Sequence, residues 1–154
     1  MKVLVTGGAG FIGSNFVRFH LANSDDEITI LDALTYAGSR DTMSDFVDDP
    51  RVMFVEGDIC DRQVVASAME GHHAVLHFAA ESHVDRSIDG SERFIKTNCV
   101  GTNTLVTSPV RWKLNGSCMY PPTKPTVQLS GALSPNKTNL HQVVPTQLLK
   151  QPLT

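Results

Sequence analysis

The stretch VLVTGGAGFIGS, residues 3–14, contains a Gly-x-Gly-x-x-Gly motif that begins at Gly8 and is preceded by Gly7. A short β-branched run that stops at glycines is typical of a buried parallel strand. Residues 11–24 follow with apolar side chains at helical spacing. Glycines between a strand and a helix let the backbone turn tightly and approach a pyrophosphate, to which the helix N-terminus offers unpaired N–H groups. The stretch therefore predicts the first strand, turn and helix of a dinucleotide-binding fold.

Strands and helices alternate outward from this stretch, and no internal repeat interrupts them. Alternation of this kind predicts βαβ units, and hence a parallel sheet with right-handed crossovers. We therefore expect an α/β fold over residues 1–105, the N-terminal half of a doubly wound, Rossmann-type sheet. The predicted strands are residues 2–6, 27–32, 51–58 and 73–80, and the predicted helices are residues 11–24, 41–49, 61–71 and 91–105.

The alternation stops after Leu105, and the composition changes at the same place. All 16 acidic residues lie at or before Glu92, whereas residues 106–154 hold five basic residues and no acidic one. Seven of the eight prolines also lie in residues 106–154, which is too many for a helix or a central strand. We expect two units, a partial NAD-type Rossmann domain at 1–105 and a largely disordered tail at 106–154.

The composition also excludes several classes of partner. The five basic residues of 106–154 form no cluster, so no nucleic-acid partner is expected. No apolar run is long enough for a signal peptide or a membrane span, which predicts a cytoplasmic protein with no membrane partner. Cys60, Cys99 and Cys118 lack metal-type spacing, so we expect no metal site and three free thiols in the core.

Asp32 ends the second predicted strand, 19 residues after Gly13. This is near the spacing of the acid that binds the ribose in dinucleotide-binding folds. A carboxylate at that position accepts hydrogen bonds from a ribose 2′-OH and repels a 2′-phosphate, and Ala33 rather than an Arg follows it. NAD is therefore favoured over NADP. The alternative role for Asp32 is to cap a loop.

Further polar residues follow the third and fourth predicted strands, at the edge where ligands bind in open α/β sheets. Asp58 and Ile59 follow the third strand, and the alternative role for Asp58 is to cap a helix. Glu81, Ser82 and His83 follow the fourth strand. His83 has the chemistry of a general base, but a structural role is favoured for a lone histidine.

Several stretches now point to one family. They are VTGGAGFIGS, LDALTYAG, GDICD, HFAAESHVDRSI and FIKTNCVGTNTL. Together they closely resemble the dTDP-glucose 4,6-dehydratases, which are extended short-chain dehydrogenases/reductases, and the match covers residues 1–105 almost without a break. The topology of that family implies the strand order 3-2-1-4. Phe78, where the family usually has Leu, is one small departure.

The resemblance implies a set of residues that bind NAD and a contact with the sugar nucleotide, dTDP-glucose, at Ser82. It also implies a homodimer, an assembly that we do not expect this chain to keep. The implied cofactor-binding residues are Gly7, Gly10, Phe11, Ile12, Gly13, Asp32, Ala33, Leu34, Thr35, Asp58, Ile59, Phe78, Ala79, Ala80, Glu81, Ser82 and Thr97.

The reaction that the resemblance implies converts dTDP-glucose to dTDP-4-keto-6-deoxyglucose. Hydride leaves C4 of the glucose for NAD, water is eliminated across C5–C6, and the hydride returns to C6. The family uses a Tyr-x-x-x-Lys pair, in which the Lys charge lowers the Tyr pKa, and a Thr-Asp-Glu run just after the fifth strand. We expect both to be lost with the reading frame after about Leu105, so no catalytic residue is predicted in this chain.

The codons of residues 106–154 permit both motifs in a shifted frame. When each new codon takes the last base of one codon and the first two of the next, CMYPPTK permits His-Val-Ser-Thr-Asp-Glu. In the same frame, QVVPTQLLKQPLT permits a run containing Tyr-Ala-Ala-Ser-Lys, and WKLNGSC permits Glu-Val-Glu-Arg-Phe-Val, which is typical of a fifth strand. We infer the loss of one base, or its equivalent, at about codon 105.

Three functions stay open. The chain is a dehydratase by descent that is inactive as written, a non-catalytic NAD-binding remnant or pseudogene product, or a related NAD-dependent sugar-nucleotide epimerase or decarboxylase. The Thr-Asp-Glu run in the shifted frame argues against the third. We also expect the fifth strand to be absent, which would leave the fourth with an unpaired edge. NAD binding is then expected to be weak or absent, without turnover.

Overall fold

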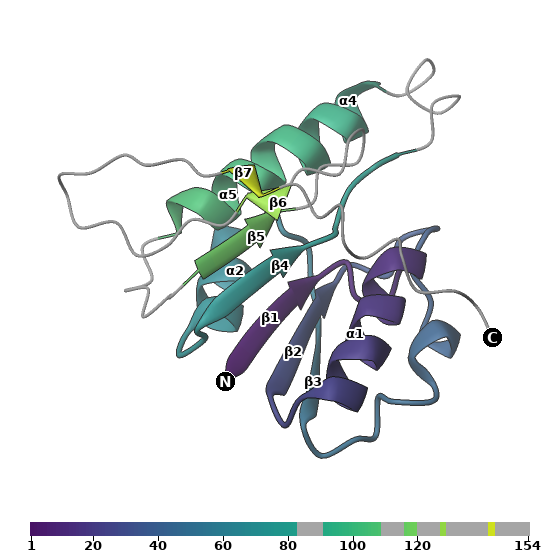
Figure 1. Cartoon of the computed structure of the whole chain (residues 1–154). Coiled ribbons are helices and arrows are strands. Elements are labelled where there is room, and N and C mark those ends of the chain that lie inside the picture. Colours follow the sequence, from purple (N-terminus) through teal and green to yellow (C-terminus); the bar gives the residue numbers. More distant parts are fainter. Residues whose placement is uncertain (83–90, 109–115, 120–126, 129–141, 144–154) are drawn as a thin grey trace, which may run out of the picture.

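The computed structural model describes residues 1–82, 91–108, 116–119, 127–128 and 142–143 (Figure 1). The strands of its parallel sheet are β1 Lys2–Thr6, β2 Glu27–Asp32, β3 Val52–Glu56, β4 Ala74–His77 and β5 Gly116–Met119. The helices are α1 Phe11–Asn23, the 3-10 helix η1 Asp41–Met43, α2 Arg62–Met69, and a run of α4 Ser91–Phe94, the π-helix η2 Ile95–Gly101 and α5 Thr102–Thr107. The strands β6 Val127–Gln128 and β7 Gln142–Val143 form a separate antiparallel pair.

The sheet has the order β3-β2-β1-β4-β5, and all four neighbouring pairs are parallel. The α/β class is therefore confirmed, and so is the order 3-2-1-4 for the first four strands. β1 lies at the centre, where Val3 pairs with Ile28 on one side and Ala74 on the other. Because parallel strands end at the same edge, the segments that follow β1 to β4 meet there.

The expected loss of the fifth strand is wrong. β5 pairs with β4 along its whole length, from Ala74 opposite Gly116 to His77 opposite Met119. The physical reason is that a parallel ladder uses main-chain N–H and C=O groups, which any extended segment without proline supplies. The segment 116–119 therefore provides the strand, and the sheet extends past the predicted boundary at residue 105. The remaining prediction for 106–154, a largely disordered tail, falls mainly outside the described residues.

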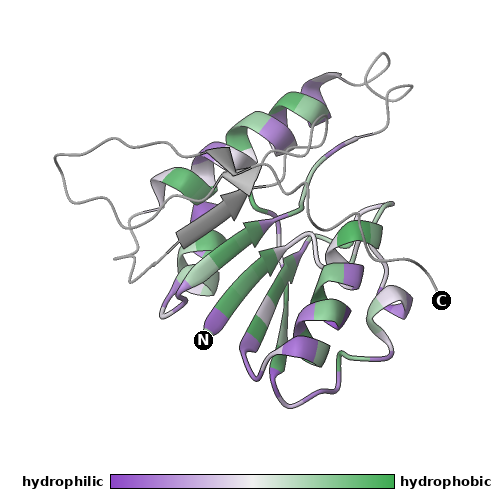
Figure 2. Ribbon diagram, in the orientation of Figure 1, coloured by the Kyte–Doolittle hydropathy of each residue, from purple (hydrophilic) through white to green (hydrophobic). Residues whose placement is uncertain are grey.

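The core lies in two layers, one on each face of the sheet. On the α1 face, Val3, Val5 and Ile30 pack with Val17 of α1. On the other face, Leu4 and Leu31 pack with residues of α2 and α5, and Figure 1 shows α2 behind the sheet. β1 is hydrophobic over most of its length, with a hydrophilic residue at its start (Figure 2). Burial on both faces explains why β1 and β2 have continuous apolar runs rather than an alternating pattern.

The helix predicted at 91–105 is present, but its middle is not α-helical. Residues 95–101 form a π-helix between two α-helical segments. Gly101 ends this π-helix where a Cβ atom would lie 2.5 Å from Ile59 Cδ1, so glycine lets the helix approach the segment after β3. Single π-helical turns within α-helices frequently occur at functional sites. This one carries Thr97 and Asn98, whose positions matter below.

Candidate functional site

A pocket lies at the carboxyl ends of β1 to β4, where the sequence predicts a ligand site. Each of these strands contributes the residues that end it or follow it, and η2 contributes one more. The pocket is lined by Gly7, Gly10, Leu31, Asp32, Ala33, Thr35, Ala37, Gly38, Gly57, Asp58, Ile59, Phe78, Ala79, Ala80, Glu81 and Thr97.

The glycine turn brings α1 close to the end of β1. Gly7 has a φ of 72°, a left-handed conformation that glycine adopts readily, and its N–H donates to Leu31 O at 2.9 Å. At Gly13 a Cβ atom would meet the Gly7 carbonyl oxygen and lie 2.8 Å from Gly8 Cα. Only glycine therefore fits at Gly13 without a shift of the turn.

The N-terminus of α1 is open toward ligand. The N-cap residue Gly10 has no side chain to cap the helix, and the first turn holds no acidic residue. The unpaired N–H groups and the positive end of the helix dipole are therefore available to an anion. Phe11 and Ile12 expose 83% and 54% of their surface, an unusual exposure for such side chains.

Asp32 is buried and oriented by main-chain groups. Its Oδ2 accepts a hydrogen bond from Ala9 N, and its Oδ1 accepts one from Leu34 N, both at 2.9 Å. Leu34 makes its bond from a φ of 48°, in the left-handed region that disfavours side chains. The carboxylate thus joins the glycine turn to the segment after β2. It is fixed at the pocket, where its remaining lone pairs can accept hydrogen bonds from ligand hydroxyls.

Asp58 does not cap a helix. Its Oδ1 accepts from Cys60 N at 2.9 Å, which closes a turn, and its Oδ2 lies 3.8 Å from Lys96 Nζ. The residue that caps α2 is Asp61, whose carboxylate accepts from Gln63 N and Val64 N. The alternative role for Asp58 is therefore wrong, and its side chain lines the pocket.

The segment after β4 forms the opposite side of the pocket. Glu81 is held through its main chain by the Asn98 amide, which accepts from Glu81 N and donates to Glu81 O, both at 2.9 Å. The carboxylate Oε2 of Glu81 accepts a hydrogen bond from the Tyr36 hydroxyl at 2.7 Å. Sequence reasoning did not single out Asn98 or Tyr36, although both lie in stretches that carry the family resemblance.

The pocket brings together most of the predicted cofactor residues. Those that line it are Gly7, Gly10, Asp32, Ala33, Thr35, Asp58, Ile59, Phe78, Ala79, Ala80, Glu81 and Thr97. The predicted residues outside its lining are Phe11, Ile12, Gly13, Leu34 and Ser82, and the lining residues not predicted are Leu31, Ala37, Gly38 and Gly57. The individual ligand contacts, including the sugar-nucleotide contact of the exposed Ser82, stay predictions, and His83 lies outside the described residues.

Cys60 offers no nucleophile to the pocket at neutral pH. Burial, with a smaller effect from Asp58, raises the pKa of the Cys60 thiol to about 11, so this thiol is protonated at neutral pH. Cys60 and Cys99 are both free, but Cys99 is exposed, so the predicted core position is wrong for it. Within the described ranges no group of His, Cys, Asp and Glu could hold a metal ion.

One Tyr-x-x-x-Lys spacing does occur in the sequence, at Tyr120 and Lys124. It follows β5 directly, where the family resemblance implies the Thr-Asp-Glu run instead. Pro121 and Pro122 lie between the two residues and oppose the helical turn that would bring Tyr and Lys onto one face. These residues lie outside the described ranges, and the shifted frame of the same codons permits Ser-Thr-Asp-Glu. We therefore assign this spacing no catalytic role.

Comparisons with known proteins agree with this geometry. The family model described as GDP-mannose 4,6 dehydratase matches residues 4–119, which end with the last residue of β5. Low-salt glycan biosynthesis protein Agl12 of Haloferax volcanii is 60% identical over 106 residues, 69% of this chain and 34% of that protein. The dTDP-glucose 4,6-dehydratase 1 of Escherichia coli K12 is 52% identical over 108 residues, 69% of this chain and 30% of the relative.

The crystal structure of a DesIV double mutant, a dTDP-glucose 4,6-dehydratase from Streptomyces venezuelae with NAD and DAU bound, is also similar. It has a TM-score of 0.72 and 49% identity over 76% of this chain and 38% of that one. The chain spans about a third of the length of the curated relatives that it matches. Within the described helices, none is long and apolar enough to cross a membrane. By its fold, its pocket and these matches, the chain belongs to the family of nucleotide-sugar dehydratases that the GDP-mannose 4,6 dehydratase model describes.

Proposed function

We propose that residues 1–105 are the NAD-binding part of a dTDP-glucose 4,6-dehydratase, an enzyme that forms dTDP-4-keto-6-deoxyglucose. The proposal rests on two features of the structure that lie side by side. The open N-terminus of α1 and the fixed carboxylate of Asp32 meet at one pocket, joined by the hydrogen bond from Ala9 N to Asp32 Oδ2. Two named relatives above, at about 50% identity, are dTDP-glucose 4,6-dehydratases, and this sets the choice of substrate.

The residues present fit a dinucleotide. A Cβ atom at Gly7 would lie 2.5 Å from Ala79 N, so the glycine keeps the turn close to the segment after β4. The N–H groups at the start of α1 would hold the pyrophosphate, and Asp32 would accept from the ribose hydroxyls. Asp58 and Ile59, which line the same pocket, would also contact the cofactor. When bound, NAD supplies an acceptor for hydride and returns that hydride later in the reaction.

The charge of the pocket supports NAD rather than NADP. Three lining residues are carboxylates, Asp32, Asp58 and Glu81, and the described lining contains no Lys, Arg or His. A 2′-phosphate beside Asp32 would add like-charge repulsion without a cation to offset it. The pyrophosphate itself would depend on main-chain N–H groups and the helix dipole.

We further infer that the chain leaves the dehydratase reading frame at about codon 105. Alignments with three relatives at 50–60% identity extend over 106 to 108 residues, and the family model matches as far as residue 119, which supports a loss of similarity in the stretch that begins near that codon. The Tyr-Lys and Thr-Asp-Glu motifs would then be encoded only in the shifted frame. The chain as written is a non-catalytic part of the enzyme. We place it in the cytoplasm, without a nucleic-acid or membrane partner, and expect it not to form the family's homodimer.

Turnover tests this proposal. The purified chain, incubated with dTDP-glucose and NAD, is expected to form no 4-keto-6-deoxy product, because it lacks the base and the acid pair. Sequencing of the gene across codons 100–112 identifies the missing base, and a protein translated from the corrected frame is expected to form the product. Product from the chain as written would contradict the inferred loss of catalysis. C4 epimerisation without loss of water by the corrected protein would favour the epimerase alternative.

A further inference from the structure

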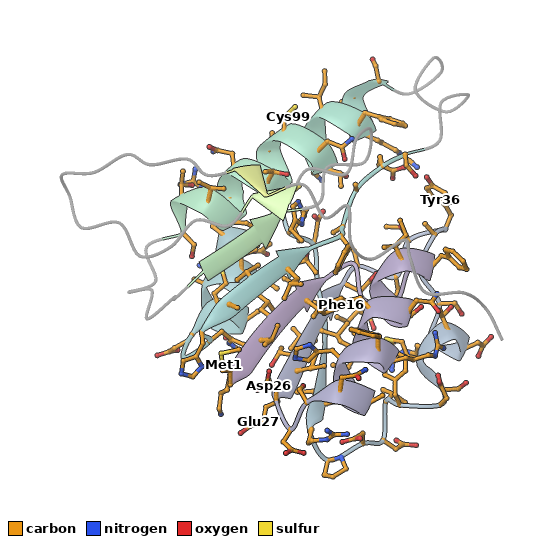
Figure 3. The ribbon with its side chains drawn as sticks, viewed as in Figure 1. Met1, Phe16, Asp26, Glu27, Tyr36 and Cys99 are labelled. Atoms are coloured by element: carbon orange, nitrogen blue, oxygen red, sulfur yellow. The ribbon has the colours of Figure 1, made fainter. Side chains whose placement is uncertain are left out.

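Tyr36 and Glu81 join the two sides of the pocket through their side chains. The Tyr36 hydroxyl donates to Glu81 Oε2 at 2.7 Å across 45 positions of sequence. Tyr36 lies in the segment after β2, between the lining residues Thr35 and Ala37. Glu81 lies in the segment after β4 and lines the pocket from the opposite side. Figure 3 shows the Tyr36 side chain reaching from its loop toward the segment that follows β4.

The main chain is anchored on both sides of this link. The Asn98 amide holds both the N–H and the carbonyl of Glu81. On the other side, Gly38 N donates to Thr35 O at 3.1 Å, and Ser39 N donates to Ala9 O at 3.3 Å. Tyr36 exposes 44% of its surface, so its hydroxyl bond competes with water more readily than the bonds that fix the two segments. Of these hydrogen bonds, the side-chain link is therefore the one that opens most easily.

We propose that the Tyr36–Glu81 link is a gate across the pocket, which opens whenever a dinucleotide enters or leaves. This inference rests on the proposed function. Tyr36 acts as a positioning residue, because its hydroxyl holds the carboxylate of the lining residue Glu81. The Tyr36–Glu81 hydrogen bond is formed to the same extent in the free chain and in the chain with NAD bound. It therefore raises the barrier to passage in both directions and leaves the affinity unchanged.

The substitution Tyr36→Phe tests the gate, because it removes only the hydroxyl. We expect kon and koff for NAD each to rise about fivefold, the factor for a net hydrogen bond of ordinary strength, while Kd changes less than twofold. Relaxation dispersion on the adenine H2 proton of NAD gives koff, and its chemical-shift titration gives Kd. Glu81→Gln keeps an oxygen acceptor but loses the charge, so its rates are expected to lie between those of wild type and Tyr36→Phe.

Ser44→Ala is a matched control. It also removes an exposed hydroxyl, which donates to Asp41 O at 2.9 Å, but Ser44 does not line the pocket. It is expected to leave both rates unchanged. A rise in koff without a rise in kon would overturn the gate, because it would show that the Tyr36 hydroxyl contacts the ligand directly. A fall in kon alone would overturn it in favour of a link that preforms the pocket.

Side-chain NMR of the free chain tests the link without NAD. The carboxylate carbon shift of Glu81 is expected to differ from wild type in Tyr36→Phe and to be unchanged in Ser44→Ala. An unchanged shift in Tyr36→Phe would show that the hydroxyl does not hold the Glu81 side chain, and would overturn the gate whatever the chain binds. If the shift responds but wild type binds no NAD, then the proposed function fails and the gate for NAD fails with it.

Discussion

Gly13→Ala is expected to lower the free energy of unfolding by about 3 kcal/mol or more, the upper range for overpacking. The added methyl group would meet the carbonyl oxygen of Gly7 and lie 2.8 Å from Gly8 Cα. Both neighbours are backbone atoms of the turn that fixes β1 relative to α1, so they cannot move aside as a flexible side chain would. Urea denaturation followed by circular dichroism measures the loss.

The control for this variant is Gly10→Ala, in the same motif. A Cβ atom there would lie 3.3 Å from Gly7 O and 3.7 Å from Ala37 O, which is close but tolerable. Gly10→Ala is therefore expected to change the free energy of unfolding by less than about 1 kcal/mol. If the two variants unfold at the same urea concentration, the close approach of α1 to the turn is not as described here.

Lowering the pH from 6.5 to 4 is expected to reduce the free energy of unfolding by about 3 kcal/mol through His77 alone. His77 is buried in β4, where Nδ1 lies 2.6 Å from Thr6 Oγ1 and Nε2 lies 3.0 Å from Thr102 Oγ1. Burial lowers the pKa of His77 to about 4, whereas in the unfolded chain it is near 6.5. Within this window the unfolded chain binds a proton that the folded chain rejects, so stability falls as the pH falls.

Replacing His77 with Gln removes this titration and keeps a neutral group that can bond both threonines. The slope of unfolding free energy against pH is expected to flatten between pH 6.5 and pH 4 in His77→Gln. Burial also lowers the pKa of His72, whose Nε2 lies 2.8 Å from Thr29 Oγ1, so part of the slope persists in the variant. The pKa values of Asp45 and Asp49 are also lowered in the folded chain. These two groups affect stability mainly below this pH window, because their pKa values in the unfolded chain are near 4. Identical slopes in wild type and variant would contradict the neutral state of His77.

The parts of the fold that sequence predicts well are those with local signals. β1 and α1 follow from a glycine motif between two apolar patterns, and α2 follows from Asp61 at its start and Gly71 beyond its end. Gly71 does have a φ of 75°, with open space around it. His77 lies within a strand that the sequence predicts, and it is buried there.

The features that sequence could not supply depend on contacts between distant segments. Asn98 binds the main chain of Glu81 at a separation of 17 residues, and no local pattern identifies a side chain that bonds to a distant backbone. The π-helix at 95–101 likewise has no local pattern that identifies it, and its last residue, Gly101, packs closely against the distant Ile59. β5 was not expected because the reading frame was inferred to be lost before it, yet its pairing with β4 needs only main-chain groups.

Calorimetric titration of the full chain with NAD, and separately with NADP, tests most directly whether residues 1–105 hold a cofactor site. The account predicts weak but saturable binding of NAD, with a Kd of about 1 mM, and NADP at least about tenfold weaker, a difference of ~1.4 kcal/mol. Asp32→Asn, which removes the charge and keeps the shape, is expected to narrow that difference. Heat without saturation for NAD, or equal binding of NADP by the wild-type chain, would contradict the account.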